Sequence, residues 1–151
     1  MARKVLTVTI GPDGGRDAGK QFQLTEMAAT QAERFASRAF LAMARGGVEV
    51  PDDLASAGLA GLSQMGLKAL SGVRWEDAEP LMDEMMTCVK VLPDPSRPSI
   101  VRGLIEDDIE EVRTRVKLRM ELVKLHLDFS EAAAPSTSGP AAAMRVVSSS
   151  T

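Results

Sequence analysis

The chain has 151 residues, of which 44% are hydrophobic and 26% are charged, and its formal net charge is −3. This length and apolar content suffice for one domain with a hydrophobic core, whereas the acidic balance disfavours nucleic acid or an anionic membrane as the main partner. The single cysteine, Cys88, excludes an internal disulfide and a cysteine metal cluster, and no apolar stretch approaches the ~20 residues that span a bilayer, so we expect a soluble intracellular protein.

The N-terminal part predicts a β-hairpin. Residues 4–10 (KVLTVTI) alternate between two faces, and residues 20–24 (KQFQL) alternate again, with Phe22 and Leu24 on one side. Residues 11–19 between them are rich in Gly, Asp and Pro, which is typical of a long hairpin loop. Because two strands are only marginally stable in water, we expect a helix or a neighbouring chain to cover them.

Residues 25–45 predict the first helix, which Thr25 or Thr30 could cap and which Gly46 and Gly47 end. Residues 54–70 are apolar but contain three glycines, which predicts one or two short helices in close contact with a neighbour. The apolar face of the first helix consists of alanine, phenylalanine and methionine side chains: Met27, Ala32, Phe35, Ala36, Ala39, Phe40 and Met43.

A further helix is expected after Trp75, which we interpret as an anchor in a loop. Asp77 is a suitable N-cap because it would place Pro80 in the first turn, where the missing N–H costs little. A Pro-rich break at residues 92–98 and a strand fragment at residues 99–103 follow. The inward side of the helix would carry Leu81, Met82, Met85, Met86 and Val89.

Residues 105–127 lie within the longest stretch without Gly or Pro, between Gly103 and the Ala/Pro/Ser-rich tail, and predict the central helix of the protein. Its acidic residues come first and its basic residues follow, which suits the helix dipole. Leu118, Leu122 and Leu125 form a second, partial apolar strip that is either core or a surface for a partner. The main apolar face, at steps of three and four, consists of Ile105, Ile109, Val112, Val116, Met120, Val123 and Leu127.

These elements predict a mainly α fold with a small N-terminal β-hairpin, an α+β arrangement in which four to five helices pack around a long C-terminal helix. The hairpin at residues 1–24 and the helices at residues 25–129 would form one domain. Residues 130–151 are rich in Ala, Pro, Ser, Thr and Gly, and we expect them to be disordered.

The residues give no indication of catalysis. His126 is the only histidine and has no nucleophile motif beside it, and Cys88 lies among apolar residues as a small buried side chain would. The acidic groups at residues 76–84 and 106–111 lack the pattern of a metal site and are typical of helix surfaces. We therefore expect no cofactor and no metal, and a binding protein rather than an enzyme.

The order of these elements resembles the small tail assembly chaperones of tailed bacteriophages and prophages. The resemblance covers residues 3–130, and three stretches carry it: residues 27–38, residues 75–89, and residues 113–129 with their Lys-Leu-His-Leu-Asp-Phe ending. It implies a non-enzymatic protein of the host bacterial cytoplasm that binds the aggregation-prone tape measure protein, keeps it soluble during tail morphogenesis, and is absent from the mature virion.

In many members of that family a ribosomal frameshift appends a second domain that contacts the tail tube protein, which would be a further partner, and self-association stays open. The family has no motif that fixes functional residues. The alternatives are a structural virion or head–tail connector protein, and a prophage regulatory protein acting on nucleic acid. From the apolar strips, we expect the partner to contact Met82, Met85, Met86, Leu118, Leu122 and Leu125.

Overall fold

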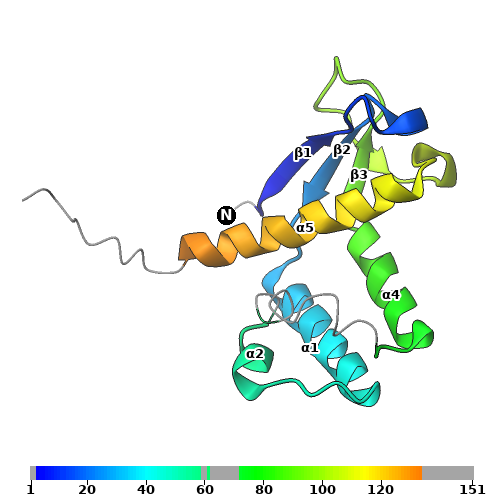
Figure 1. The fold of residues 1–151 in the computed structure, drawn as a ribbon. Coiled ribbons are helices and arrows are strands. Elements are labelled where there is room, and N and C mark those ends of the chain that lie inside the picture. The colour runs from blue at the N-terminus through cyan, green and yellow to red at the C-terminus, as the bar shows by residue number, and fades with distance from the viewer. Residues whose placement is uncertain (1–2, 59–60, 62–71, 134–151) are drawn as a thin grey trace, which may run out of the picture.

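The computed structural model describes residues 3–58, 61 and 72–133, which form a mixed α+β fold. Its centre is a four-stranded antiparallel sheet with the strands in chain order, β1-β2-β3-β4 (Figure 1). The expected hairpin is present as β1 and β2, and β4 lies within the strand fragment expected at residues 99–103. The sheet is larger than expected because β3 also joins it. The strands are β1 (Val5–Thr9), β2 (Gln21–Thr25), β3 (Val89–Leu92) and β4 (Arg102–Gly103).

One face of the sheet is apolar, because residues that pair directly across antiparallel strands point to the same side. Val8 pairs with Phe22, which pairs with Val91, and Leu24 pairs with Val89 in the neighbouring row. All five side chains are buried, whereas the opposite face of β1 and β2 carries threonine and glutamine side chains and the exposed Val5. A sheet of this kind needs a cover on its apolar face only.

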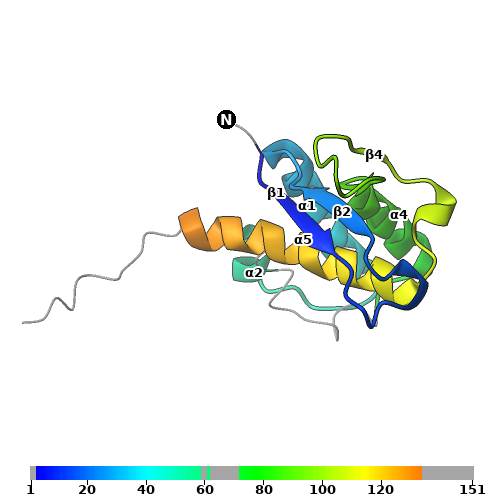
Figure 2. The same cartoon turned by 90° about the horizontal axis from the view of Figure 1, so that it is seen from above.

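Helix α5 (Val112–Ala133) provides that cover and lies across the strands (Figures 1 and 2). Leu118, Leu122 and Leu125 of this helix are 0%, 1% and 7% exposed and join the sheet residues in one hydrophobic cluster. Burial of a leucine contributes about 1.5–3 kcal/mol, so these three residues attach α5 to the sheet. Of the two interpretations that the sequence leaves open for this strip, the structure supports the core.

The boundaries of α5 differ from the expected helix at residues 105–127. Glu106–Asp108 form a separate 3-10 turn, η2, and Ile109 after it has extended backbone angles, so α5 begins only at Val112. At its other end α5 continues to Ala133, past the point at which we expected a disordered tail. The rest of that expected tail lies outside the described residues.

The expected helix that follows the hairpin is α1 (Ala29–Arg45), and Gly46 and Gly47 end it as predicted, with a φ of 86° at Gly47. The predicted start is wrong. Thr25 belongs to β2, and the residue before the first turn is Ala28, which makes no side-chain cap. Thr30 lies inside α1, so neither of the two expected threonines caps the helix.

A second hydrophobic cluster surrounds α1. Ala36, Phe40 and Met43 are buried there, and Val48, Val50 and Val73 pack against them. Ion pairs attach α1 to α4 (Trp75–Met86), where Arg38 bonds to Glu84 and Arg45 approaches Asp77 at 3.3 Å. In Figure 1, α1 lies beyond the lower ends of the strands, next to α4.

Helix α4 also differs from its prediction. It begins at Trp75, so Pro80 lies inside the helix and Asp77 is in the first turn instead of capping it. The expected anchor Trp75 is 62% exposed. Val89, predicted for the inward side of this helix, belongs to β3, because the chain leaves the helix after Met86 and pairs with β2.

Part of the expected Gly-rich helical segment at residues 54–70 corresponds to α2 (Asp52–Ser56), and most of the remainder lies outside the described residues. Among the helices that the structure describes, none combines the length and apolar character required to cross a membrane.

Candidate partner-binding surface

The outward side of α5 exposes a row of apolar side chains. Val112, Val116 and Met120 are spaced four residues apart, and they are 77%, 41% and 56% exposed. Side chains at this spacing line one side of a helix, and both Val116 and Met120 lie two residues, or about 200° of rotation, from Leu118 of the buried strip. The row Val112, Val116 and Met120 is called the outer strip below.

The outer strip is part of the main apolar face that the sequence predicts for the core. That prediction is wrong for Val112, Val116 and Met120, whereas Ile109 of the same face packs against the cluster under the sheet. Charged residues divide α5 into two apolar strips on opposite sides, and the spacing of each is compatible with burial. The position of a strip around the helix therefore does not show which of the two strips is buried. The three leucines are the strip that the sheet buries, which leaves the two valines and the methionine facing outward.

Basic side chains flank the outer strip along its length. Arg113, Lys117 and Lys124 are exposed, and Arg115 and Arg119 are half-buried on the other flank. Burial of the guanidinium, followed by the charge of Arg115, lowers the pKa of Arg119. Between Val112 and His126 the single carboxylate is Glu121, which pairs with Lys124 at 3.2 Å. Within the described part of the chain, the other four cations have no carboxylate within 4.0 Å, so this surface has an excess of positive charge.

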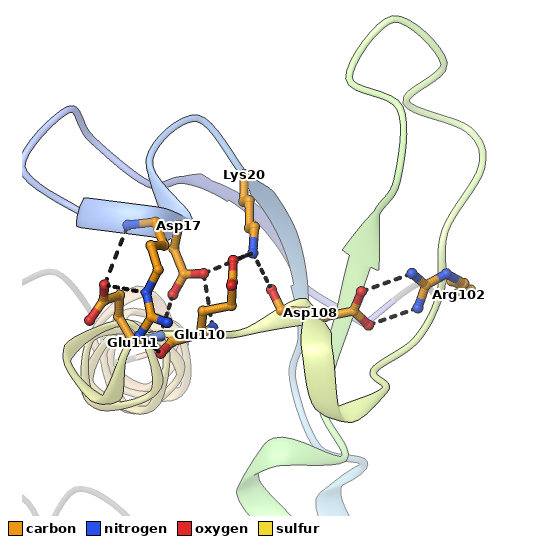
Figure 3. A network of polar contacts seen from close by, with 7 residues as sticks. Asp17, Lys20, Arg102, Asp108, Glu110 and Glu111 are labelled. Carbon is orange, nitrogen blue, oxygen red and sulfur yellow. Dashed lines mark hydrogen bonds and ion pairs between the residues drawn. The ribbon is translucent and has the colours of Figure 1, made fainter.

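The buried carboxylate of Asp17 holds the start of α5 in place (Figure 3). It comes from the hairpin loop, in the short 3-10 turn η1 (Gly15–Asp17). Its two oxygens accept hydrogen bonds from the backbone N–H groups of Glu110 and Glu111, each at 2.9 Å. These N–H groups lie immediately before the first turn of the helix, where the positive end of the helix dipole also stabilises a negative charge.

Asp17 is stabilised in its ionised form. Burial alone would raise the pKa of its carboxyl, but the hydrogen bonds from the Glu110 N–H, Lys20 and the Glu111 N–H outweigh burial and hold that pKa well below its usual range. Lys20 donates to Asp17 at 2.9 Å and to the Glu110 carboxylate at 3.1 Å, and its own pKa is raised, first by the bond to Asp17.

Two further ion pairs fix the segment that leads into α5. Arg16 bonds to Glu111 at 3.2 Å and donates to the Glu110 carbonyl at 2.9 Å. Arg102 makes two bonds to the Asp108 carboxylate, at 2.7 and 2.8 Å, and that carboxylate also accepts from the Ile105 N–H. The sequence predicts that Asp108, Glu110 and Glu111 stabilise the start of a helix by their charge. In the structure they join the hairpin loop and β4 to the N-terminal end of α5 (Figure 3).

The methionines predicted to contact a partner lie mostly in the hydrophobic core or against it. Met86 belongs to the hydrophobic cluster under the sheet, Met85 packs against that cluster, and Met82 is half-buried. Beside Met86 lies an open hollow of about 370 Å³ with charged side chains of both signs in its wall. Its charged and apolar lining consists of Asp83, Met86, Val89, Lys90, Leu104, Ile105, Glu106, Ile109 and Arg115.

His126 and Cys88 have structural positions. The His126 ring accepts at Nε2 from the Met27 N–H, at 2.9 Å, and lies 2.8 Å from the Leu122 carbonyl at Nδ1. Because a carbonyl can only accept, Nδ1 carries the proton. Burial raises the pKa of the Cys88 thiol, which disfavours the reactive thiolate. Among the described residues, no group of three or more His, Cys, Asp or Glu is arranged to hold a metal ion.

Searches of protein-family models, curated proteins and solved structures find no match to this chain.

Proposed function

We propose that this protein is a tail assembly chaperone of a tailed phage or prophage, which binds the tape measure protein in the host cytoplasm. The observation that carries the proposal is the outer strip of α5, an apolar row on the solvent side of a helix whose inner side is already buried against the sheet. An exposed row of this kind, bordered by polar residues, is typical of a surface that receives another helix.

The proposed role follows from the chemistry of such a surface. A long helical protein with unassembled apolar faces aggregates unless those faces are covered. The outer strip can cover one apolar row of such a partner, while the Asp17 carboxylate and the ion pairs of the hairpin loop keep α5 in position. Reversible contact through a narrow strip suits a protein that leaves before the virion matures.

The test is co-expression with the tape measure protein encoded nearby, scored by solubility and co-purification. We expect a soluble complex with the natural chain and loss of that complex with the double variant Val116→Ser and Met120→Ser. The matched control is Leu41→Ser, because Leu41 is 64% exposed on α1 and lies outside the outer strip.

A tape measure protein that stays insoluble and unbound with the natural chain would contradict the proposal. The edge strand β1, with the exposed Val5, is the feature that favours the alternative, a structural component retained in the particle. Detection of the protein in purified virions would support that alternative, and its absence from them would support the chaperone.

A further inference from the structure

We propose that the outer strip of α5 selects a partner helix whose own apolar row is flanked by carboxylates. This inference rests on the proposed function, because it specifies the chemistry of the partner that the same surface would bind. Val112, Val116 and Met120 provide the apolar contact, and the cations beside them provide the selection.

The geometry of the strip defines the contact. From Val112 to Met120 the strip is about 12 Å long, at about 1.5 Å per residue. Side chains at i, i+4 and i+8 form a single ridge, and such ridges pack into the matching groove of a second helix with the axes crossing at about 50°. The strip is therefore long enough for about two turns of a crossing helix.

The charge around the strip defines the partner. Arg113 and Lys117 border it on one side and Arg119 on the other, and within the described residues none of these three has a carboxylate within 4.0 Å. The neighbouring acids Glu110 and Glu111 are already bound by Lys20 and Arg16. Carboxylates on both sides of the partner's row would complement these cations, whereas lysines there would be repelled.

The composition of the strip favours a protein helix over a membrane or a nucleic acid, which are the other anionic partners that a basic surface attracts. An interfacial membrane helix normally inserts Trp, Phe or Leu side chains, and the strip has two valines and one methionine. Binding of single-stranded nucleic acid normally uses aromatic side chains on which bases stack, and the described part of α5 with side chains, residues 112–126, has no aromatic ring other than the buried His126.

The experiment uses the full chain and three labelled peptides of about 18 residues, long enough to form helix on binding. The peptides share one leucine row and differ only in the flanking residues, which are Glu, Gln or Lys. Fluorescence anisotropy should show the Glu peptide binding on the order of tenfold more tightly than the Gln peptide, and the Lys peptide not binding. Added salt should weaken the binding of the Glu peptide more than that of the other peptides.

Variants of one exposed lysine test the selection directly. Lys117→Glu should weaken binding of the Glu peptide and strengthen binding of the Lys peptide. Lys117→Gln should give intermediate affinities for both peptides. The control is Lys90→Glu, which changes an exposed lysine on β3 and should leave all three peptides unchanged. Far-ultraviolet circular dichroism of each variant establishes that it is folded.

Equal binding of the three peptides would overturn the inference, as would binding of phosphatidylglycerol vesicles or duplex DNA in place of the Glu peptide. The failure of the proposed function is a separate result. If the natural chain and Lys117→Glu retain the tape measure protein equally well, the charge selection is wrong and the chaperone role stands. If the Glu peptide binds but the tape measure protein is not retained, the selection stands and the chaperone role is wrong.

Discussion

Asp17 is the residue that joins the hairpin loop to α5, and its energetic role follows from its burial. The side chain is 0% exposed, and its charge is satisfied by two backbone N–H groups and by Lys20. A buried carboxylate is costly unless it is bonded in this way. Removal of the charge would leave the Lys20 ammonium and the start of α5 without their main acceptor.

We expect Asp17→Asn to destabilise the protein by about 2–4 kcal/mol at neutral pH, because hydrogen bonds to a buried charged group are lost. The folded pKa of Asp17 lies below that of the unfolded chain, about 3.9. Its contribution is therefore complete above that value and is lost as the pH falls through the folded pKa. The difference in unfolding free energy between the natural chain and the variant should shrink as the pH is lowered below about 4.

Urea denaturation at a series of pH values measures this difference. Asp13→Asn is the control, since Asp13 is exposed in the same loop and should change stability little at any pH. A constant difference between the natural chain and Asp17→Asn from neutral to acid pH would show that the Asp17 charge does not act as described.

His126 is the second residue with a defined structural task, since it links α5 to the segment between β2 and α1. His126→Ala removes the acceptor of the Met27 N–H and the donor to the Leu122 carbonyl. We expect a loss of about 1–3 kcal/mol of unfolding free energy and faster hydrogen exchange at the Met27 amide. Lys124→Ala, at an exposed position of the same helix, should show neither change, and normal exchange at Met27 in His126→Ala would contradict the assigned bond.

Among the elements, α5 has the clearest division of roles between its two sides. We expect Leu118→Ala to cost about 2–5 kcal/mol, because it opens a cavity against the sheet. Val116→Ala, on the outer strip, should change stability by less than about 0.5 kcal/mol and reduce partner capture instead. Thermal denaturation and co-purification of the two variants measure both effects, and equal destabilisation would place the outer strip in a core.

The sequence was sufficient for elements that local signals determine. The alternation in β1 and β2 gives the hairpin and its apolar side, with Phe22 and Leu24 on one face as predicted, and the structure buries both. The glycines at positions 46 and 47 give the end of α1. In these cases the alternation or the positive φ is a property of a few adjacent residues, so no distant contact is needed to predict it.

Elements that depend on distant contacts were missed. The four residues of β3 are too few to distinguish a strand from the end of a helix by periodicity, and their pairing with β2 decides the question. Asp17 could not be identified as a cap from its own neighbours, because Glu110 is 93 positions away. The outer strip was recognised as apolar and assigned inward, because only the position of the sheet shows which of the two strips of α5 is buried.

At the scale of the molecule, the described residues divide into two hydrophobic clusters that α4 connects. Met86 at the end of α4 belongs to the cluster between the sheet and α5, whereas Glu84 and Asp77 bond to α1, which has its own cluster around Met43. Exposed ion pairs of this kind contribute little free energy. The region around α1 should therefore open independently of the sheet.

Native-state hydrogen exchange tests this division. In the natural chain we expect the amides of α1 to exchange faster than those of β2. Met43→Ala removes a side chain that is 1% exposed, and a loss of about 3 kcal/mol would accelerate exchange in α1 on the order of 100-fold while β2 is unchanged. Leu122→Ala, in the other cluster, should accelerate exchange in β2 and leave α1 unchanged, because α1 opens without exposing Leu122. Equal acceleration of both regions by Met43→Ala would show instead that the two clusters unfold as one cooperative unit.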